Sequence, residues 1–128
     1  MQERRKEPRK NLMAYTQVFD LYDGYLIGHL GDLTLIGAMV ISEKTMEENT
    51  ELTLAIELPD LPNIKVARLA LAARAVWCQQ DLSPEYFNIG FEFNNATPEQ
   101  KKVIQAIIDN YEFRHDLPSY PIKPSPEK

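Results

Sequence analysis

The apolar residues change their spacing within residues 86–111, which read YFNIGFEFNNATPEQKKVIQAIIDNY. Over 86–94 they recur at every second position, which is typical of a strand with one buried face. Thr97 and Pro98 then match the N-cap and first position of a helix, and Gln100 completes a Thr-x-x-Gln capping box. The residues that follow form a stripe at helical spacing: Val103, Ile104, Ile107, Ile108 and Tyr111. The stretch therefore predicts a last strand followed by one C-terminal helix.

Five further strands are predicted upstream, over residues 12–22, 25–33, 37–42, 51–58 and 64–78. Asp23-Gly24 is a hairpin signal, and Gly28 and Gly31 indicate a bulge or a close backbone approach in the second strand. One face of 64–78 is expected to carry Leu69, Leu71, Ala73, Ala75 and Trp77. The predicted fold is mainly β: a six-stranded antiparallel barrel, closed or nearly closed, with one C-terminal α-helix. Closure is favoured because it removes exposed sheet edges.

The length of 128 residues, 44% of them apolar, suits one domain. It is too short for an enzyme with separate cofactor and substrate domains. We expect residues 1–11 to form a flexible arm, 12–114 the barrel and helix, and 115–128 an extended tail, since four prolines fall in that last segment.

Charge is distributed unevenly along the chain. Residues 1–10 carry five basic and two acidic side chains, whereas residues 11–128 carry nine basic and 17 acidic ones. A basic arm on an acidic body argues against general binding of duplex nucleic acid, which needs a broad basic face. A single cysteine, Cys78, and no apolar run near the roughly 20 residues that span a bilayer indicate a cytoplasmic protein without membrane insertion.

Signatures of catalysis are missing from the sequence. His29 and His115 have no Cys, His or Asp at metal-ligand spacing, and Cys78 is read as a small apolar filler. Asp32 beside Thr34 lacks an accompanying base and oxyanion hole. The sequence therefore predicts neither an enzyme nor a metal or cofactor site.

Two short motifs remain, one on each side of the first predicted hairpin. The arm contains Arg5-Lys6-Glu7-Pro8-Arg9, and the junction of the second and third strands contains Asp32-Leu33-Thr34-Leu35-Ile36-Gly37. Taken singly, the first reads as a solvated tail and the second as a turn whose Asp and Thr bond local backbone. The 23-residue gap between Arg9 and Asp32 holds one hairpin, which would return the chain to its start.

Together these motifs resemble the PilZ family of cyclic di-GMP receptors, which pairs Arg-x-x-x-Arg with (Asp/Asn)-x-Ser-x-x-Gly. The resemblance covers about residues 4–111, and Thr34 stands where the family usually has Ser. It implies a split barrel that binds cyclic di-GMP through Arg5, Arg9, Asp32, Thr34 and Gly37. Arg4, just before the first motif arginine, implies two stacked ligand molecules per chain. The family also implies a protein partner, such as a motility or exopolysaccharide component.

The chemistry of these side chains fits that ligand. A guanidinium fork matches the O6/N7 edge of guanine or a phosphate, and a carboxylate such as Asp32 accepts from N1–H and N2–H₂. The Thr34 hydroxyl offers one more hydrogen bond, and Gly37 allows close approach to the backbone. The arm is expected to order over the ligand and so present a new surface to the partner.

Two other functions stay open at this point. One is a ligand-independent adaptor that binds only protein. The other is a barrel for single-stranded nucleic acid, which needs stacking aromatics on a basic face; the aromatic residues at 87, 91 and 93 share a face with Ile89 and fit a core better. No DNA or RNA partner is therefore expected, and the chain is expected to be a monomer or a weak homodimer.

Overall fold

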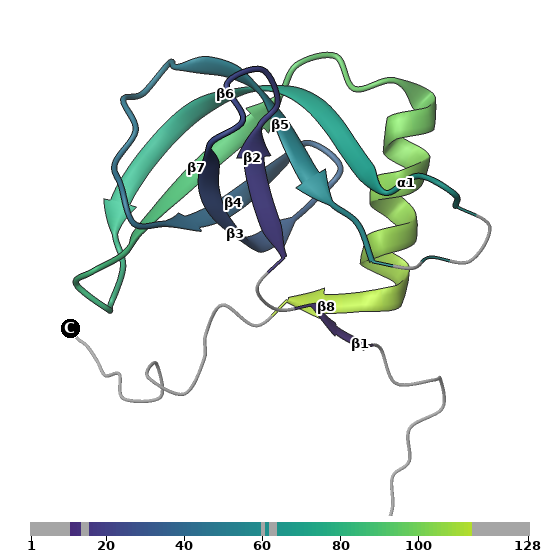
Figure 1. The fold of residues 1–128 in the computed structure, drawn as a ribbon. Helices are drawn as coiled ribbons and strands as arrows, with labels where there is room; N and C mark the ends of the chain where they lie inside the picture. The colour runs from purple at the N-terminus through teal and green to yellow at the C-terminus, as the bar shows by residue number, and fades with distance from the viewer. Residues whose placement is uncertain (1–10, 14–15, 60, 62–63, 114–128) are drawn as a thin grey trace, which may run out of the picture.

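The computed structural model describes residues 11–13, 16–59, 61 and 64–113. Six strands close into a barrel in the order β2-β3-β4-β7-β6-β5, and neighbouring strands are antiparallel (Figure 1). The strands are β2 (Gln17–Asp20), β3 (Leu26–Leu33), β4 (Gly37–Ser42), β5 (Glu51–Glu57), β6 (Arg68–Gln80) and β7 (Phe87–Phe93). Helix α1 (Pro98–Asn110) follows β7. The predicted barrel with one C-terminal helix is confirmed.

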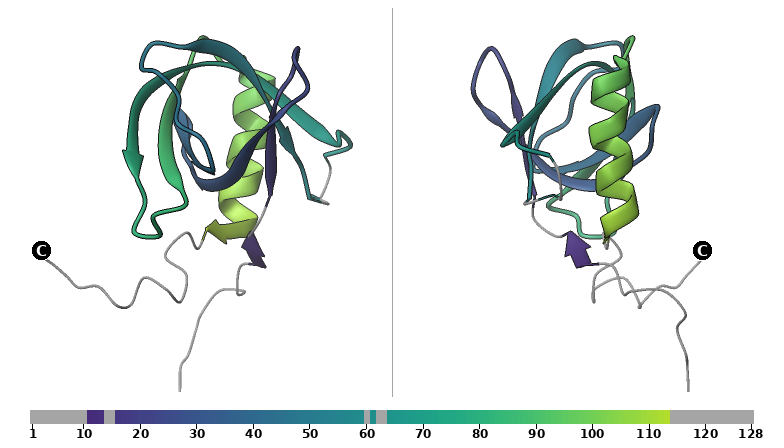
Figure 2. Two further views of the ribbon diagram at one scale, coloured as in Figure 1. Left: turned by 60° about the vertical axis from the view of Figure 1, so that its left-hand side comes forward. Right: turned by 90° about the vertical axis from the view of Figure 1, so that its right-hand side faces the viewer.

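One hydrophobic core fills the barrel and continues onto the helix. Leu54, Ile56 and Ile89 point inward from the strands, and Ile104 and Ile107 join them from α1; all are at most 1% exposed. Figure 2 shows the helix running alongside the barrel wall. Burying its apolar stripe fixes the helix there, because burial of a side chain of this size contributes roughly 1.5–3 kcal/mol.

The predicted capping box is present at the start of α1. The Thr97 hydroxyl accepts from the Gln100 amide at 3.1 Å, and the Gln100 side chain accepts from the Thr97 amide at 2.8 Å. The Gln100 side-chain amide also donates to the Ala70 carbonyl at 2.7 Å, which ties the helix to β6. In the described ranges no helix is long and apolar enough to cross a membrane.

The first predicted strand, over 12–22, is wrong as a single element. Its beginning forms β1 (Asn11–Met13), which pairs in parallel with β8 (Tyr111–Phe113) outside the barrel, and β2 starts only at Gln17. Tyr111, predicted on the helical stripe, instead has extended backbone (φ −136°, ψ 151°) and opens β8. Pairing of the backbones of 11–13 and 111–113 decides the conformation of both segments here and overrides the apolar periodicity of each. This pairing could not be predicted from one sequence.

The hairpin and the glycine irregularities agree with the sequence. Gly24 has φ 77° and donates to the Asp20 carbonyl at 2.8 Å between β2 and β3. The β3–β4 register shifts between Leu30 and Asp32, which places the predicted bulge at Gly31. A Cβ added at Gly28 would lie 2.1 Å from the Ile41 carbonyl oxygen, so the close approach is confirmed as well.

Strand β6 differs from the prediction at both ends and in the middle. It runs from Arg68 to Gln80 instead of 64–78, and its register with β7 shifts between Ala75 and Trp77. The extra residue, Val76, reverses the inward–outward alternation after it. Ala75 is therefore fully buried, whereas Trp77, predicted to share its face, is 37% exposed on the outside of the barrel. This bulge is what gives the outer face an aromatic side chain.

Candidate functional site

A surface hollow of about 310 Å³ lies on the outside of the barrel, where β3, β4, β6 and β7 meet. The β3–β4 loop, residues 34–36, forms one side of it, and the bulged part of β6 forms another. The residues that line it include the polar Asp32, Thr34 and Glu92, the aromatic Trp77 and Phe91, and Gly37 and Gly90. The strand pairing thus brings three of the predicted site residues, Asp32, Thr34 and Gly37, into one hollow.

Thr34 holds the β3–β4 loop in shape. Its hydroxyl accepts from the amides of Gly37 at 3.1 Å and Ile36 at 3.3 Å and lies 3.3 Å from the Gly37 carbonyl oxygen. The Thr34 amide donates to the same carbonyl at 2.9 Å. The hydroxyl therefore has a structural role in the turn, whatever it binds in addition.

Asp32 is exposed at the mouth of the hollow. Its Oδ1 accepts from the Leu33 amide at 2.9 Å, which fixes the orientation of the carboxylate. Within the described part of the chain no hydrogen bond is found to Oδ2. The carboxylate is thus held by one oxygen and retains acceptor capacity on the other.

Gly37 is required by the packing of the strands. A Cβ added there would lie 2.3 Å from the Phe91 carbonyl oxygen of β7, closer than a real Cβ contact allows. The absence of a side chain is accordingly explained without a ligand. Its expected part in ligand approach stays a prediction.

Trp77 forms an aromatic wall of the hollow. Its indole lies against Gly90 on the neighbouring strand, where an added Cβ would be 2.1 Å from Cε2 and 2.2 Å from Nε1. Sequence reasoning missed this residue because it placed Trp77 on the same face as Leu71, Ala73 and Ala75, which the structure shows to be buried. A glycine in a strand interior, Gly90, was the available signal, since it marks a place where something approaches the backbone closely.

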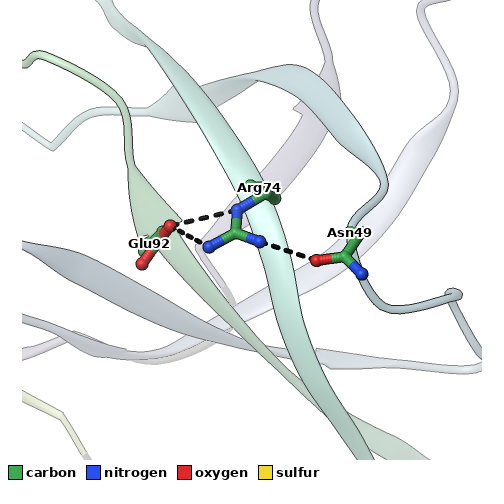
Figure 3. A network of polar contacts seen from close by, with 3 residues as sticks. All are labelled: Asn49, Arg74 and Glu92. Atoms are coloured by element: carbon green, nitrogen blue, oxygen red, sulfur yellow. Dashed lines mark hydrogen bonds and ion pairs between the residues drawn. The ribbon is translucent and has the colours of Figure 1, made fainter.

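A polar network borders the hollow on the side of β6 and β7 (Figure 3). Arg74 donates to Oε2 of Glu92 through Nε at 3.0 Å and also through Nη2, and its Nη1 donates to Oδ1 of Asn49 at 2.6 Å. Glu92 lines the hollow. The sequence could not reveal this network, because it joins residues 18 and 25 positions apart whose register was unknown.

The family model for the PilZ domain matches residues 3–110 of the chain. The chain belongs to the PilZ family. The predicted resemblance is confirmed, and the matched range contains Arg4, Arg5 and Arg9 as well as the loop that starts at Asp32.

Solved PilZ structures share the fold at low sequence identity. One is described as the PilZ domain with c-di-GMP of YcgR from Escherichia coli: it is 19% identical with a TM-score of 0.57, over 84% of this chain and 90% of that one. A second, YcgR in complex with c-di-GMP from the same organism, is 18% identical with a TM-score of 0.58, over 84% of this chain and 45% of that one. This chain thus spans less than half of the longer YcgR chain. A search of curated protein sequences finds no significant match.

Arg4, Arg5 and Arg9 lie outside the residues that the structure of this PilZ domain describes. Their part in ligand binding stays a prediction. The hollow is lined by two carboxylates, Asp32 and Glu92, and by no basic side chain among the described residues. An anionic ligand there needs cations from another segment. In the described ranges no group of three or more His, Cys, Asp or Glu residues is arranged to hold a metal ion.

Proposed function

We propose that this PilZ domain is a receptor for cyclic di-GMP, which binds in the hollow between the 32–37 loop and Trp77. The observation that carries the proposal is that the acidic and aromatic side chains lie in the hollow, whereas the basic side chains are concentrated in the N-terminal segment. The hollow offers carboxylates, a turn and an aromatic wall, while five of the 14 basic side chains fall within residues 1–10. Two related PilZ structures, both of YcgR, contain c-di-GMP.

Each part of the ligand has a matching group. Asp32 accepts from the N1–H and N2–H₂ edge of one guanine, and the indole of Trp77, which is partly exposed in the hollow, stacks on a base. Stacking of a base on an aromatic side chain is worth about 1–3 kcal/mol. Arg5 and Arg9 bind the O6/N7 edge or the phosphates with charge-assisted hydrogen bonds. These arginines also offset the repulsion between the phosphates and the carboxylates of the hollow.

Ligand binding would act as a switch through the arm. Without ligand, residues 1–10 have few apolar side chains to bury. Their attraction to the exposed carboxylates of the hollow is screened by water and contributes little to ordering the arm. With two phosphates in the hollow, Arg5 and Arg9 gain partners and the arm closes over the ligand. The ordered arm then forms, with the barrel, a composite surface for a protein partner in the cytoplasm. The proposed role is binding without catalysis.

Calorimetry tests the proposal directly. Titration with cyclic di-GMP is expected to show saturable binding, and Arg5→Ala and Arg9→Ala are each expected to weaken it about tenfold or more, because a bidentate arginine contact is worth about 1–3 kcal/mol. Lys65→Ala removes an exposed basic side chain outside the hollow and serves as the matched control.

The result that contradicts the proposal is wild-type affinity in both arginine variants. A parallel titration with a short single-stranded oligonucleotide is expected to show no binding. If neither compound binds the unmutated protein, the receptor proposal is wrong and a ligand-independent adaptor is the remaining alternative.

A further inference from the structure

Glu92 places a second carboxylate in the hollow, and the chemistry assigned so far gives it no partner in the ligand. A carboxylate beside a ligand with two phosphates is unfavourable unless cations and hydrogen-bond donors compensate its charge. Arg74 compensates Glu92 through Oε2, and Oε1 still needs a donor when the ligand is bound. The donors on the bases of cyclic di-GMP lie on the N1–H and N2–H₂ edges of its guanines. Asp32 can take one such edge, which leaves a second guanine edge without an acceptor.

We propose that Glu92 is a specificity-determining residue that accepts from the N1–H and N2–H₂ edge of a guanine, and that Arg74 and Asn49 are its positioning residues. The inference rests on the proposed function, since it concerns the same hollow. It assigns one carboxylate to each of two guanine bases, Asp32 from β3 and Glu92 from β7.

The geometry at Glu92 leaves one oxygen available. Arg74 donates twice, through Nε at 3.0 Å and through Nη2, and both bonds go to Oε2. No hydrogen bond to Oε1 is found within the described part of the chain. Glu92 is thus clamped by one oxygen and presents the other, the same arrangement as in Asp32 with its single bond through Oδ1.

The clamp itself is fixed at its far end. Nη1 of Arg74 donates to the side chain of Asn49 at 2.6 Å (Figure 3). The backbone amide of Asn49 donates to the Ala75 carbonyl at 2.7 Å, and the backbone amide of Ala75 donates to the Thr50 carbonyl at 2.9 Å. Asn49 has φ 73°, a left-handed conformation that asparagine tolerates better than most residues. The guanidinium is therefore held at both ends, and the Glu92 carboxylate keeps its orientation before any ligand arrives.

The strand register places Glu92 beside the loop of the site. Gly37 of β4 pairs with Glu92 of β7, which in turn pairs with Arg74 of β6. Gly37 closes the turn that Thr34 holds. A base that lies against this loop therefore meets the Glu92 carboxylate on the next strand.

This arrangement selects guanine by the hydrogen-bond donors on its Watson–Crick edge. A carboxylate facing the Watson–Crick edge of guanine meets two donors, N1–H and N2–H₂. Facing the same edge of adenine, it meets one donor, N6–H₂, and the N1 acceptor, whose lone pair repels it. Hypoxanthine keeps N1–H and lacks the 2-amino group, so its cyclic dinucleotide, cyclic di-IMP, isolates the second hydrogen bond.

The test is Glu92→Gln, with Glu57→Gln as the matched control. Glu57 is paired with Arg68 in the same way, through Nε at 3.2 Å and Nη2 at 2.8 Å to one oxygen, but it lies outside the hollow. Glu92→Gln keeps an acceptor for Arg74, and its thermal unfolding midpoint, compared with that of Glu57→Gln, checks the fold. Calorimetry with cyclic di-GMP and cyclic di-IMP is then run on both variants and on the unmutated protein.

We expect Glu92→Gln to weaken cyclic di-GMP binding about tenfold, as for loss of a hydrogen bond to a charged group. The preference for cyclic di-GMP over cyclic di-IMP should shrink in parallel. Arg74→Ala should shrink the same preference, which a purely structural role would not do, and Glu57→Gln should change neither quantity. If Glu92→Gln binds cyclic di-GMP unchanged, Glu92 does not contribute to ligand affinity, and if it binds more tightly, Glu92 repels phosphate. Either result makes the inference wrong, while the receptor function stands. If the unmutated protein does not bind cyclic di-GMP, the proposed function itself fails.

Discussion

Replacement of Gly90 by alanine moves one aromatic ring and little else. A Cβ at this position would lie 2.1 Å from Cε2 of Trp77, whereas carbon atoms in contact settle at about 3.5 Å or more, so the indole has to move outward by about 1.4 Å. The atoms that yield belong to a side chain that is already 37% exposed. Alanine in a strand also costs less backbone entropy than glycine, by roughly 0.5–1 kcal/mol. We therefore expect Gly90→Ala to fold normally.

The expected effect falls on ligand binding. If the indole stacks on guanine, its displacement removes part of a contact worth about 1–3 kcal/mol, so cyclic di-GMP affinity should fall roughly fivefold to tenfold. Trp77→Ala removes the whole contact and should weaken binding by more than Gly90→Ala does, by up to about 3 kcal/mol. Tyr22→Ala is the matched control, since it removes an aromatic side chain that is 81% exposed and lies outside the hollow.

Tryptophan fluorescence and calorimetry together provide the assay. Trp77 is the only tryptophan in the sequence, so its emission reports on this ring alone. The emission of ligand-free Gly90→Ala should differ from that of the unmutated protein, and cyclic di-GMP should change the unmutated emission on binding. Trp77→Ala with wild-type affinity would refute the stacking role, and so would a displaced ring in Gly90→Ala without any loss of affinity.

Three further predictions concern the loop and the arm. Thr34→Val keeps the shape of the side chain and loses the hydroxyl that holds the turn. The free energy of unfolding and the free energy of cyclic di-GMP binding should therefore each weaken by about 1 kcal/mol, whereas Thr34→Ser should bind at least as well as the unmutated chain. A valine variant equal to wild type in both measurements would contradict this. Arg4 is expected to go with two ligand molecules per chain, and Arg4→Leu should shift the calorimetric stoichiometry toward one and flatten the salt dependence of binding; one ligand per unmutated chain at saturation would count against it. Hydrogen exchange over residues 1–11 should be fast without ligand and slow with it, and equal rates in both states would mean that the arm does not switch.

The barrel could be predicted because its physical causes are local. Period-two alternation in residues 51–58 and 86–94 favours strands with one buried face. The capping box at Thr97 satisfies the first amides of the helix without help from other elements. The loop motif from Asp32 to Gly37 could likewise be placed beside the barrel, because its turn is held by hydrogen bonds within six residues.

The remainder of the site depends on register, which no single segment encodes. One extra residue, Val76, turns Trp77 from the core to the hollow. Pairing of Glu92 with Arg74 follows from the alignment of β6 with β7, and pairing of Asn11–Met13 with Tyr111–Phe113 joins the two ends of the described chain. Each of these is a contact between segments far apart in sequence, so apolar periodicity could not supply it.

Nuclear magnetic resonance of the ¹⁵N-labelled chain tests the placement of the ligand most directly. The single tryptophan gives one indole Nε1–H signal, and the loop adds the amide signals of residues 32–37. On titration with cyclic di-GMP, the Trp77 indole signal and the loop amides are expected to shift together and to saturate together. Saturable shifts that leave these signals unmoved and fall instead on the separate hollow lined by Tyr25, His29 and Tyr86 would contradict it.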